Sequence, residues 1–126
     1  MIRNLTRVFL PKISWQKIKN KILSKDYDLS MVFAGDREMA RINRKYRGKS
    51  VPTNVLSFAL DRKSGEIFIG SWQARREAEK LNKSFRQHLI YLYIHALLHL
   101  KGFKHDGDKQ SKIMNRAEKK WLKILS

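Results

Sequence analysis

The amino-acid sequence predicts an α+β fold, in which one small mixed β-sheet of about four strands is packed by helices. Two observations lead to this class. Segments with strand-like and helix-like patterns alternate in the first half of the chain, and helix-like patterns dominate from about residue 72 onward. The chain has 126 residues, of which 42% are hydrophobic, so it is long and apolar enough for a real core. We therefore expect residues 1–126 to form a single domain.

The individual elements follow from local patterns. Four segments have the composition of strands bounded by turn residues: 2–9, 29–33, 54–60 and 66–70. The residues between the last two have the length of a hairpin connection. Five segments have helical periodicity: 14–23, 36–46, 72–82, 84–101 and 108–124. Ser14, Asp36 and Asp108 are suitable caps for three of these helices, and Gly48 and Pro52 make 47–53 a loop.

The segment 84–101 predicts a helix buried on every side. From Leu89 to Leu100 it is apolar all round except at its histidines. These twelve residues are too few for a membrane span, which needs about twenty. His88 precedes the apolar run, and we expect it to lie near the start of the helix in contact with solvent.

The last helix separates into two faces. We expect Ile113, Ala117, Trp121 and Ile124 to pack on the core. The opposite face is basic and consists of Lys109, Lys112, Arg116, Lys119 and Lys123.

Composition narrows the function. The formal net charge is +17, from 28 Lys and Arg against 11 Asp and Glu, which indicates a polyanionic partner, with nucleic acid favoured over an anionic membrane surface. The chain has no cysteine, which excludes disulfides, thiolate zinc sites and cysteine nucleophiles. The absence of cysteine, and an N-terminus without a secretory signal, agree with a cytoplasmic protein.

Three histidines form the most informative motif. His95 and His99 are four residues apart and share one face of the predicted helix. Gly102 can end that helix in a left-handed conformation and turn the chain so that His105 approaches the pair. Three imidazoles with a fourth position left open are typical of catalytic zinc. We therefore expect one zinc ion per chain on His95, His99 and His105, although nickel or iron suits three imidazoles too.

The spacing HxxxHxxGxxH also occurs in zinc peptidases, which need a glutamate beside the first histidine as general base. Here Ala96 occupies that position, so the peptidase hypothesis lacks its base. A two-magnesium site is excluded as well, because the chain offers no suitably spaced carboxylates. Separately, Arg47 lies in a glycine-containing loop before a strand, where a guanidinium can hold a phosphate or form an ordinary surface ion pair.

Two blocks together resemble the YbeY-type endoribonucleases, also called ribosomal RNA maturation factors. Residues 42–58 (INRKYRGKSVPTNVLSF) are similar to the family pattern LNxxYRxKDxPTNVLSF, and residues 95–106 (HALLHLKGFKHD) are similar to HGxLHLxGYDH. Residues 65–70 resemble the family's short GDI strand. Met114 and Glu118 fall where the family has a Met and a Glu on its last helix. The resemblance covers roughly residues 36–120.

The resemblance implies a mixed sheet with packed helices, zinc on the three histidines and an RNA contact by Arg47. It also implies single-strand-specific RNA cleavage, maturation of small-subunit ribosomal RNA including its 3′ end, and ribosome quality control. We expect Arg47 to be catalytic, Arg47 and Lys49 to bind RNA, and the partners to be single-stranded RNA, ribosomal RNA and the small ribosomal subunit. No membrane association is expected.

The chain departs from the family pattern at two positions. Ala96 replaces the family's glycine, and Lys104 replaces an aspartate before the third histidine. Asp106 is a possible substitute for that aspartate as an acceptor. Two alternative functions stay open: a non-catalytic RNA-binding ribosome assembly factor with structural zinc, and a zinc hydrolase of another substrate.

Overall fold

The computed structural model describes residues 1–49, 53–104 and 107–125. Over these residues the chain forms one four-stranded sheet and five helices, which confirms the predicted α+β class. In chain order the elements are β1 (Ile2–Asn4), α1 (Trp15–Ile22), β2 (Asp28–Ala34), α2 (Asp36–Arg47), β3 (Val55–Asp61), β4 (Ser64–Gly70), α3 (Ser71–Lys80), α4 (Phe85–Lys101) and α5 (Gly107–Leu125).

The sheet is mixed, with the strand order β1-β2-β4-β3. β1 and β4 both run parallel to β2, and β3 runs antiparallel to β4. The β3–β4 hairpin is tighter than expected, because Asp61 already pairs with Ser64. The Asp61 carboxylate accepts a hydrogen bond from the Lys63 backbone N–H at 2.8 Å, which stabilises this turn.

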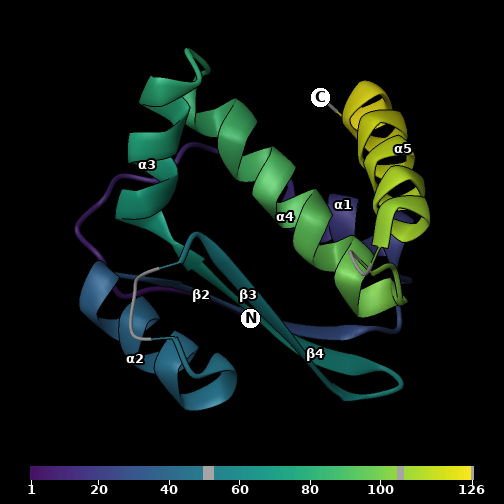
Figure 1. Ribbon diagram of the computed structural model, residues 1–126, viewed down its shortest axis with the longest axis horizontal. Helices are drawn as coiled ribbons and strands as arrows, with labels where there is room; N and C mark the ends of the chain where they lie inside the picture. The colour runs from purple at the N-terminus through teal and green to yellow at the C-terminus, as the bar shows by residue number, and fades with distance from the viewer. Residues whose placement is uncertain (50–52, 105–106, 126) are drawn as a thin grey trace.

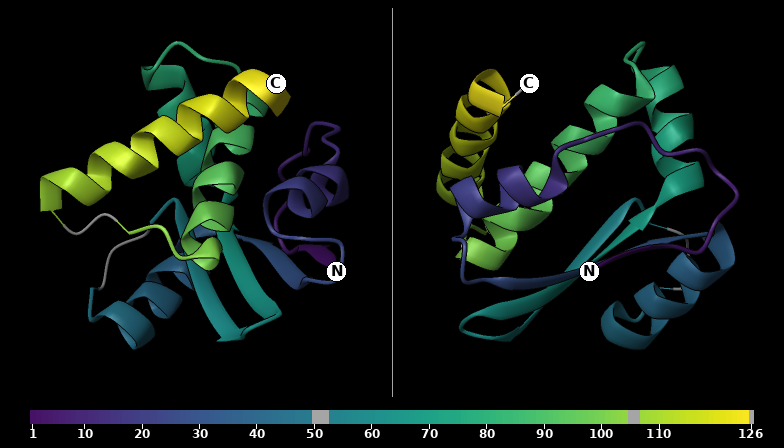
Figure 2. Two further views of the ribbon diagram at one scale, coloured as in Figure 1. Left: turned by 90° about the vertical axis from the view of Figure 1, so that its right-hand side faces the viewer. Right: turned by 180° about the vertical axis from the view of Figure 1, so that it is seen from behind.

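Helices cover both faces of the sheet (Figures 1 and 2). α4 crosses one face, with α1 beside it, and α2 lies on the opposite face. The alternation of side chains along the strands explains this division. Met31 and Phe33 of β2 join the large apolar cluster with α4, while Leu56 of β3 joins a smaller cluster with Met39 and Ile42 of α2.

The two ends of α4 are well defined. At its start, Ser84 and Gln87 form a capping box: the Ser84 hydroxyl accepts from the Gln87 N–H at 3.0 Å, and the Gln87 side chain accepts from the Ser84 N–H at 3.2 Å. At its end, Gly102 adopts the predicted left-handed conformation with φ of 116°. Most residues between are buried, as expected for an apolar helix. Local contacts therefore define where α4 begins and where it ends.

The buried face of α5 differs from the expected one. Ile113 and Ile124 are 44% and 55% exposed, whereas Met114 and Glu118 are 0% and 3% exposed. Ala117 and Trp121 are partly buried and belong both to the expected stripe through Ile113 and to the observed stripe through Met114. The apolar pattern alone therefore did not distinguish these two overlapping faces of the helix. The helix is turned so that the Glu118 carboxylate meets His95 of α4. The basic face of α5 is exposed, as predicted.

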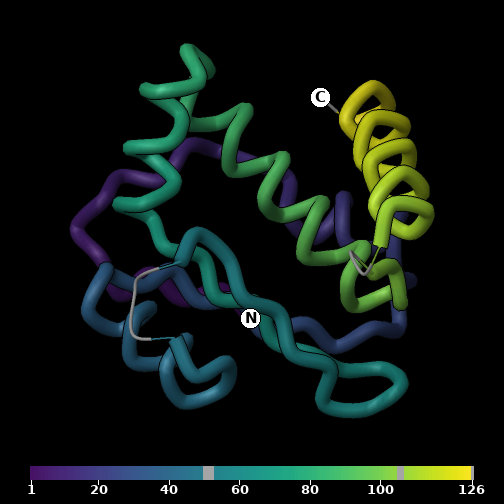
Figure 3. Tube along the Cα trace, viewed as in Figure 1, coloured from purple at the N-terminus to yellow at the C-terminus, as the bar shows by residue number. Residues whose placement is uncertain are grey.

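Smaller differences concern helix and strand starts. β1 has three residues instead of the eight expected. Gly35 occupies the N-cap of α2, and Asp36 is its first residue. Ser14 is at the N-cap of α1 but makes no side-chain cap hydrogen bond there. Between β1 and α1 the chain passes beside α3 and α4 (Figure 3). Over the described residues, no helix is both long and apolar enough to cross a membrane.

The orientation of α5 can be tested by a pair of substitutions. Met114→Ala removes a fully buried side chain and is expected to lower the free energy of unfolding by roughly 2–5 kcal/mol. Ile113→Ala, one position earlier and exposed, is expected to cost about 0.5 kcal/mol or less. Urea unfolding followed by circular dichroism measures both. Equal losses, or a larger loss for Ile113→Ala, would contradict the observed packing.

Candidate active site

A pocket of about 550 Å³ opens between β3, α4 and the end of α2. Its wall is built from both sequence blocks and from the turn after α4, and consists of Arg47, residues 53–58, His95, Ala96, His99 and Lys104. The fold thus joins in one pocket two motifs that are separated by about forty residues in the chain. The wall combines imidazoles with a guanidinium and an ammonium group, so it suits an anionic ligand.

His95 and His99 lie one turn apart on α4, as predicted. Their ring centroids are 4.8 Å apart and the rings are nearly perpendicular, at 72°. The His95 Nδ1 atom is 2.7 Å from Oε2 of Glu118, which is buried on α5. A carboxylate only accepts hydrogen bonds, so Nδ1 carries the proton and Nε2 carries the lone pair. This arrangement of a carboxylate behind an imidazole is typical of a metal-binding histidine.

The third predicted ligand, His105, lies outside the described residues, as does Asp106. Within residues 1–49, 53–104 and 107–125, no three side chains of the usual ligand types are grouped closely enough to hold a metal ion. The zinc site on His95, His99 and His105 therefore stays a prediction. The donor chemistry of the described part fits it, because two adjacent imidazoles face one pocket and one has its tautomer set by Glu118.

Tyr91 belongs to the same cluster and was missed by the sequence analysis. It lies one turn before His95, and the two ring centroids are 6.1 Å apart. Burial raises the pKa of Tyr91, and the nearby Glu118 carboxylate raises it further. Both effects favour the protonated phenol. The i, i+4 spacing to His95 was the signal that could have revealed it.

Arg47 is the last residue of α2 and is exposed, and it lines the same pocket as the histidines of α4. The structure therefore brings Arg47 and the two described histidines together, as expected. Lys49 is exposed nearby but does not line this pocket, so its RNA contact stays a prediction. Lys104, noted in the sequence as a departure from the family, lines the wall and adds a positive charge.

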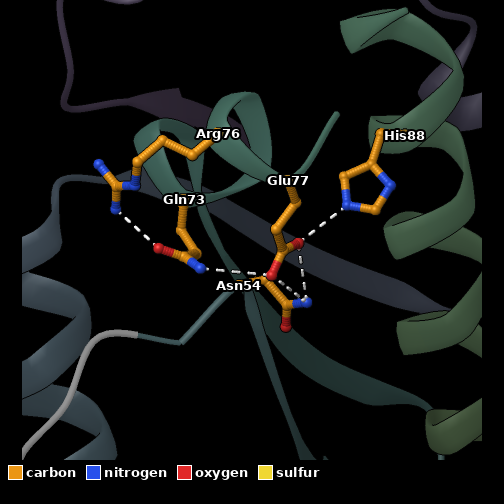
Figure 4. A network of polar contacts seen from close by, with 5 residues as sticks. All are labelled: Asn54, Gln73, Arg76, Glu77 and His88. Carbon is orange, nitrogen blue, oxygen red and sulfur yellow. Dashed lines mark hydrogen bonds and ion pairs between the residues drawn. The ribbon is translucent and has the colours of Figure 1, made fainter. Parts of the chain in front are cut away.

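A second imidazole–carboxylate pair lies beside the pocket (Figure 4). His88 was expected to meet solvent, but it is only 3% exposed, and its Nε2 atom is 2.8 Å from Oε1 of Glu77 on α3. The expectation was wrong because α3 packs against the start of α4 and supplies a carboxylate that the spacing of α4 cannot reveal. The same carboxylate accepts hydrogen bonds from Asn54 at 3.1 and 3.3 Å, and from Gln73 at 3.4 Å.

The beginning of β3 is also held through its backbone. The Asn54 carbonyl accepts a hydrogen bond from the Gly70 N–H at 2.8 Å. A Cβ atom on Gly70 would lie 2.7 Å from the Thr53 carbonyl oxygen, so a larger residue cannot occupy this position without displacing the wall. Thr53 and Asn54 are therefore fixed against the junction of β4 and α3.

The chain is similar in sequence to known proteins of one family. A family model described as Endoribonuclease YbeY matches residues 4–126. The chain belongs to the endoribonuclease YbeY family. It is 37% identical over 107 residues to Endoribonuclease YbeY of Chelativorans sp. (strain BNC1), covering 78% of this chain and 66% of that relative. It is 35% identical over 135 residues to that of Bartonella henselae, covering 100% of this chain and 84% of the relative.

The fold is shared with a solved structure as well. The solution structure of TM1509 from Thermotoga maritima is similar with a TM-score of 0.68 and 29% identity, over 99% of this chain and 89% of that one. The expected family, fold class and enzyme class are thus confirmed: the YbeY family is one of hydrolases that cut RNA internally. Within this YbeY chain Ala96 is 1% exposed on the pocket wall, so α4 accommodates the methyl group.

The Glu77 carboxylate predicts a pH dependence of stability. Burial alone would raise its pKa, but hydrogen bonds from His88, Asn54 and Gln73 outweigh burial and lower it. A carboxylate with a lowered folded-state pKa stabilises the fold above its unfolded-state pKa of about 4.3, and this contribution is lost as the pH falls through the folded-state value.

Glu77→Gln is expected to lower the free energy of unfolding at pH 7 by roughly 1–2 kcal/mol. The difference from the wild type should shrink as the pH falls below about 4. Denaturant titrations at several pH values measure it, with the exposed Glu79→Gln as control. A difference that is constant with pH would contradict the assigned ionisation.

Proposed function

We propose that this protein is a zinc-dependent endoribonuclease of the cytoplasm that cleaves single-stranded RNA. Its substrate is ribosomal RNA, including the 3′ end of the small-subunit RNA, and its role extends to ribosome quality control on the small subunit. One observation carries the proposal: a single pocket joins His95 and His99 with Arg47. Membership in the YbeY family supports RNA as the substrate.

His95, His99 and His105 would hold the metal ion. Bound zinc would polarise a phosphate or lower the pKa of a coordinated water to about 7. The residues of this chain prepare the site. Glu118 holds the His95 ring in the tautomer whose Nε2 lone pair can bind a metal, and the Tyr91 ring packs beside the His95 ring.

Arg47 would hold the scissile phosphate from the side of α2. Its guanidinium can make two parallel hydrogen bonds to phosphate oxygens and stabilise the negative charge that develops there. Lys104 adds a second cation to the same wall. The net charge of +17 draws RNA to the protein non-specifically, so binding should weaken steeply with salt. A 2′,3′-cyclic phosphate end would identify the RNA 2′-hydroxyl as nucleophile, whereas a 5′-phosphate with a 3′-hydroxyl end would identify water.

Metal content tests the site directly. We expect about one zinc per chain in protein purified without added metal, measured by mass spectrometry, and its loss in His99→Ala. Glu118→Gln keeps all three histidines and should weaken zinc affinity about 10–100-fold, measured by chelator competition. Equal zinc content in the wild type and His99→Ala would contradict a zinc site that includes His99.

Cleavage tests the role of Arg47. With zinc-loaded protein and a labelled single-stranded RNA, Arg47→Ala should lower kcat by roughly 10²-fold or more. Arg44→Ala is the matched control, because it removes the same charge one turn earlier on α2 from an exposed position outside the pocket. The proposal fails if the wild type does not cleave, or if the two variants behave alike.

A further inference from the structure

Asn54 occupies an unusual position between two sites. It lines the large pocket with Arg47 and His95, and its side chain also donates to Glu77, which is the partner of the buried His88. The backbone of Asn54 is already held by the hydrogen bond from the Gly70 N–H, so its side-chain amide is not needed to attach the chain to β4.

The amide of Asn54 has one allowed orientation. Glu77 as a carboxylate only accepts, so the NH₂ group of Asn54 must face it, and the hydrogen bonds of 3.1 and 3.3 Å to its two oxygens agree. The amide oxygen Oδ1 therefore lies on the side away from Glu77, as Figure 4 shows. A rotation of the amide by 180° would place one oxygen against another.

Glu77 is itself unable to turn away. His88 holds one of its oxygens at 2.8 Å, and Gln73 donates to the other at 3.4 Å. Because His88 is 3% exposed, water does not compete well for this contact. The Asn54 oxygen is thus an acceptor held in one orientation immediately before β3, which is a feature of binding groups that are organised in advance.

The chemistry of the wall selects the partner of this oxygen. Arg47 and Lys104 are donors that suit the phosphates of RNA. An amide oxygen cannot bond a phosphate anion, since both only accept. The donor nearest to a phosphate in the RNA backbone is the ribose 2′-hydroxyl, which also distinguishes RNA from DNA.

We propose that Asn54 contacts the substrate by accepting a hydrogen bond from a ribose 2′-hydroxyl, and that Glu77 and His88 are positioning residues that hold its amide in this orientation. The proposal deepens the function proposed above and rests on it for RNA as the ligand. It adds a residue that selects ribose over deoxyribose independently of the metal ligands.

The test compares three single-stranded oligonucleotides of one sequence: RNA, DNA and 2′-O-methyl RNA, which cannot donate. Fluorescence anisotropy gives the Kd of each, and each oligonucleotide is checked to be uncut afterwards. The wild type is expected to bind RNA about two- to tenfold more tightly than the other two. Asn54→Ala and Asn54→Ser should abolish this ratio and leave the affinity for DNA unchanged.

Two further variants separate positioning from folding. Glu77→Gln keeps the shape but can donate as well as accept, so the Asn54 amide can turn over and the RNA-to-DNA ratio should fall toward one. Gln73→Ala removes only the longest contact of Glu77, at 3.4 Å, and leaves the hydrogen bonds to His88 and Asn54, so it should keep the wild-type ratio.

The inference is overturned if the Asn54 variants keep the wild-type ratio, or if they lose affinity for RNA and DNA equally. Either result would make Asn54 a structural residue. A wild type that shows the ratio but does not cleave RNA would refute the nuclease function and leave the ribose contact standing. The two failures are therefore distinguishable.

Discussion

The structure depends on the burial of α4. This helix is largely apolar and is packed against the sheet, α1, α3 and α5, so a polar group buried on it is costly unless it is hydrogen-bonded. Two of its imidazoles find carboxylates. Glu77 reaches His88 from α3, and Glu118 reaches His95 from α5. The two helices flanking α4 are thus connected to it by polar contacts as well as by apolar packing.

The same two carboxylates prepare the pocket. Glu118 sets the tautomer of His95, and Glu77 sets the orientation of Asn54. His88 and His95 are seven residues apart on nearly one stripe of α4, with Tyr91 between them, its ring 5.9 Å from that of His88 and 6.1 Å from that of His95. A single helix face therefore carries both the imidazole that we propose as a metal ligand and the imidazole that holds Glu77 against Asn54. Satisfying the polar groups of the core and organising the pocket are achieved by the same contacts.

The sequence was sufficient for features that depend on local periodicity. It predicted the enclosed α4, its end at Gly102 and the proximity of His95 and His99, because each follows from helical spacing or from the conformation of one residue. It was insufficient where the answer depends on a distant element. The burial of His88 depends on Glu77 of α3, which approaches only in the folded chain. No local pattern encodes that approach.

The face of α5 illustrates the same limit. The stripes through Ile113 and Met114 share Ala117 and Trp121, so hydrophobicity does not choose between them. The choice is made by Glu118, which gains a buried hydrogen bond with His95 only when the helix is turned toward Met114. Neither Glu118 nor Glu77 lines the large pocket, so among the described residues its wall carries the cations Arg47 and Lys104 without an opposing carboxylate. The two acids support the site from behind, since Glu118 orients its imidazole and Glu77 orients its amide.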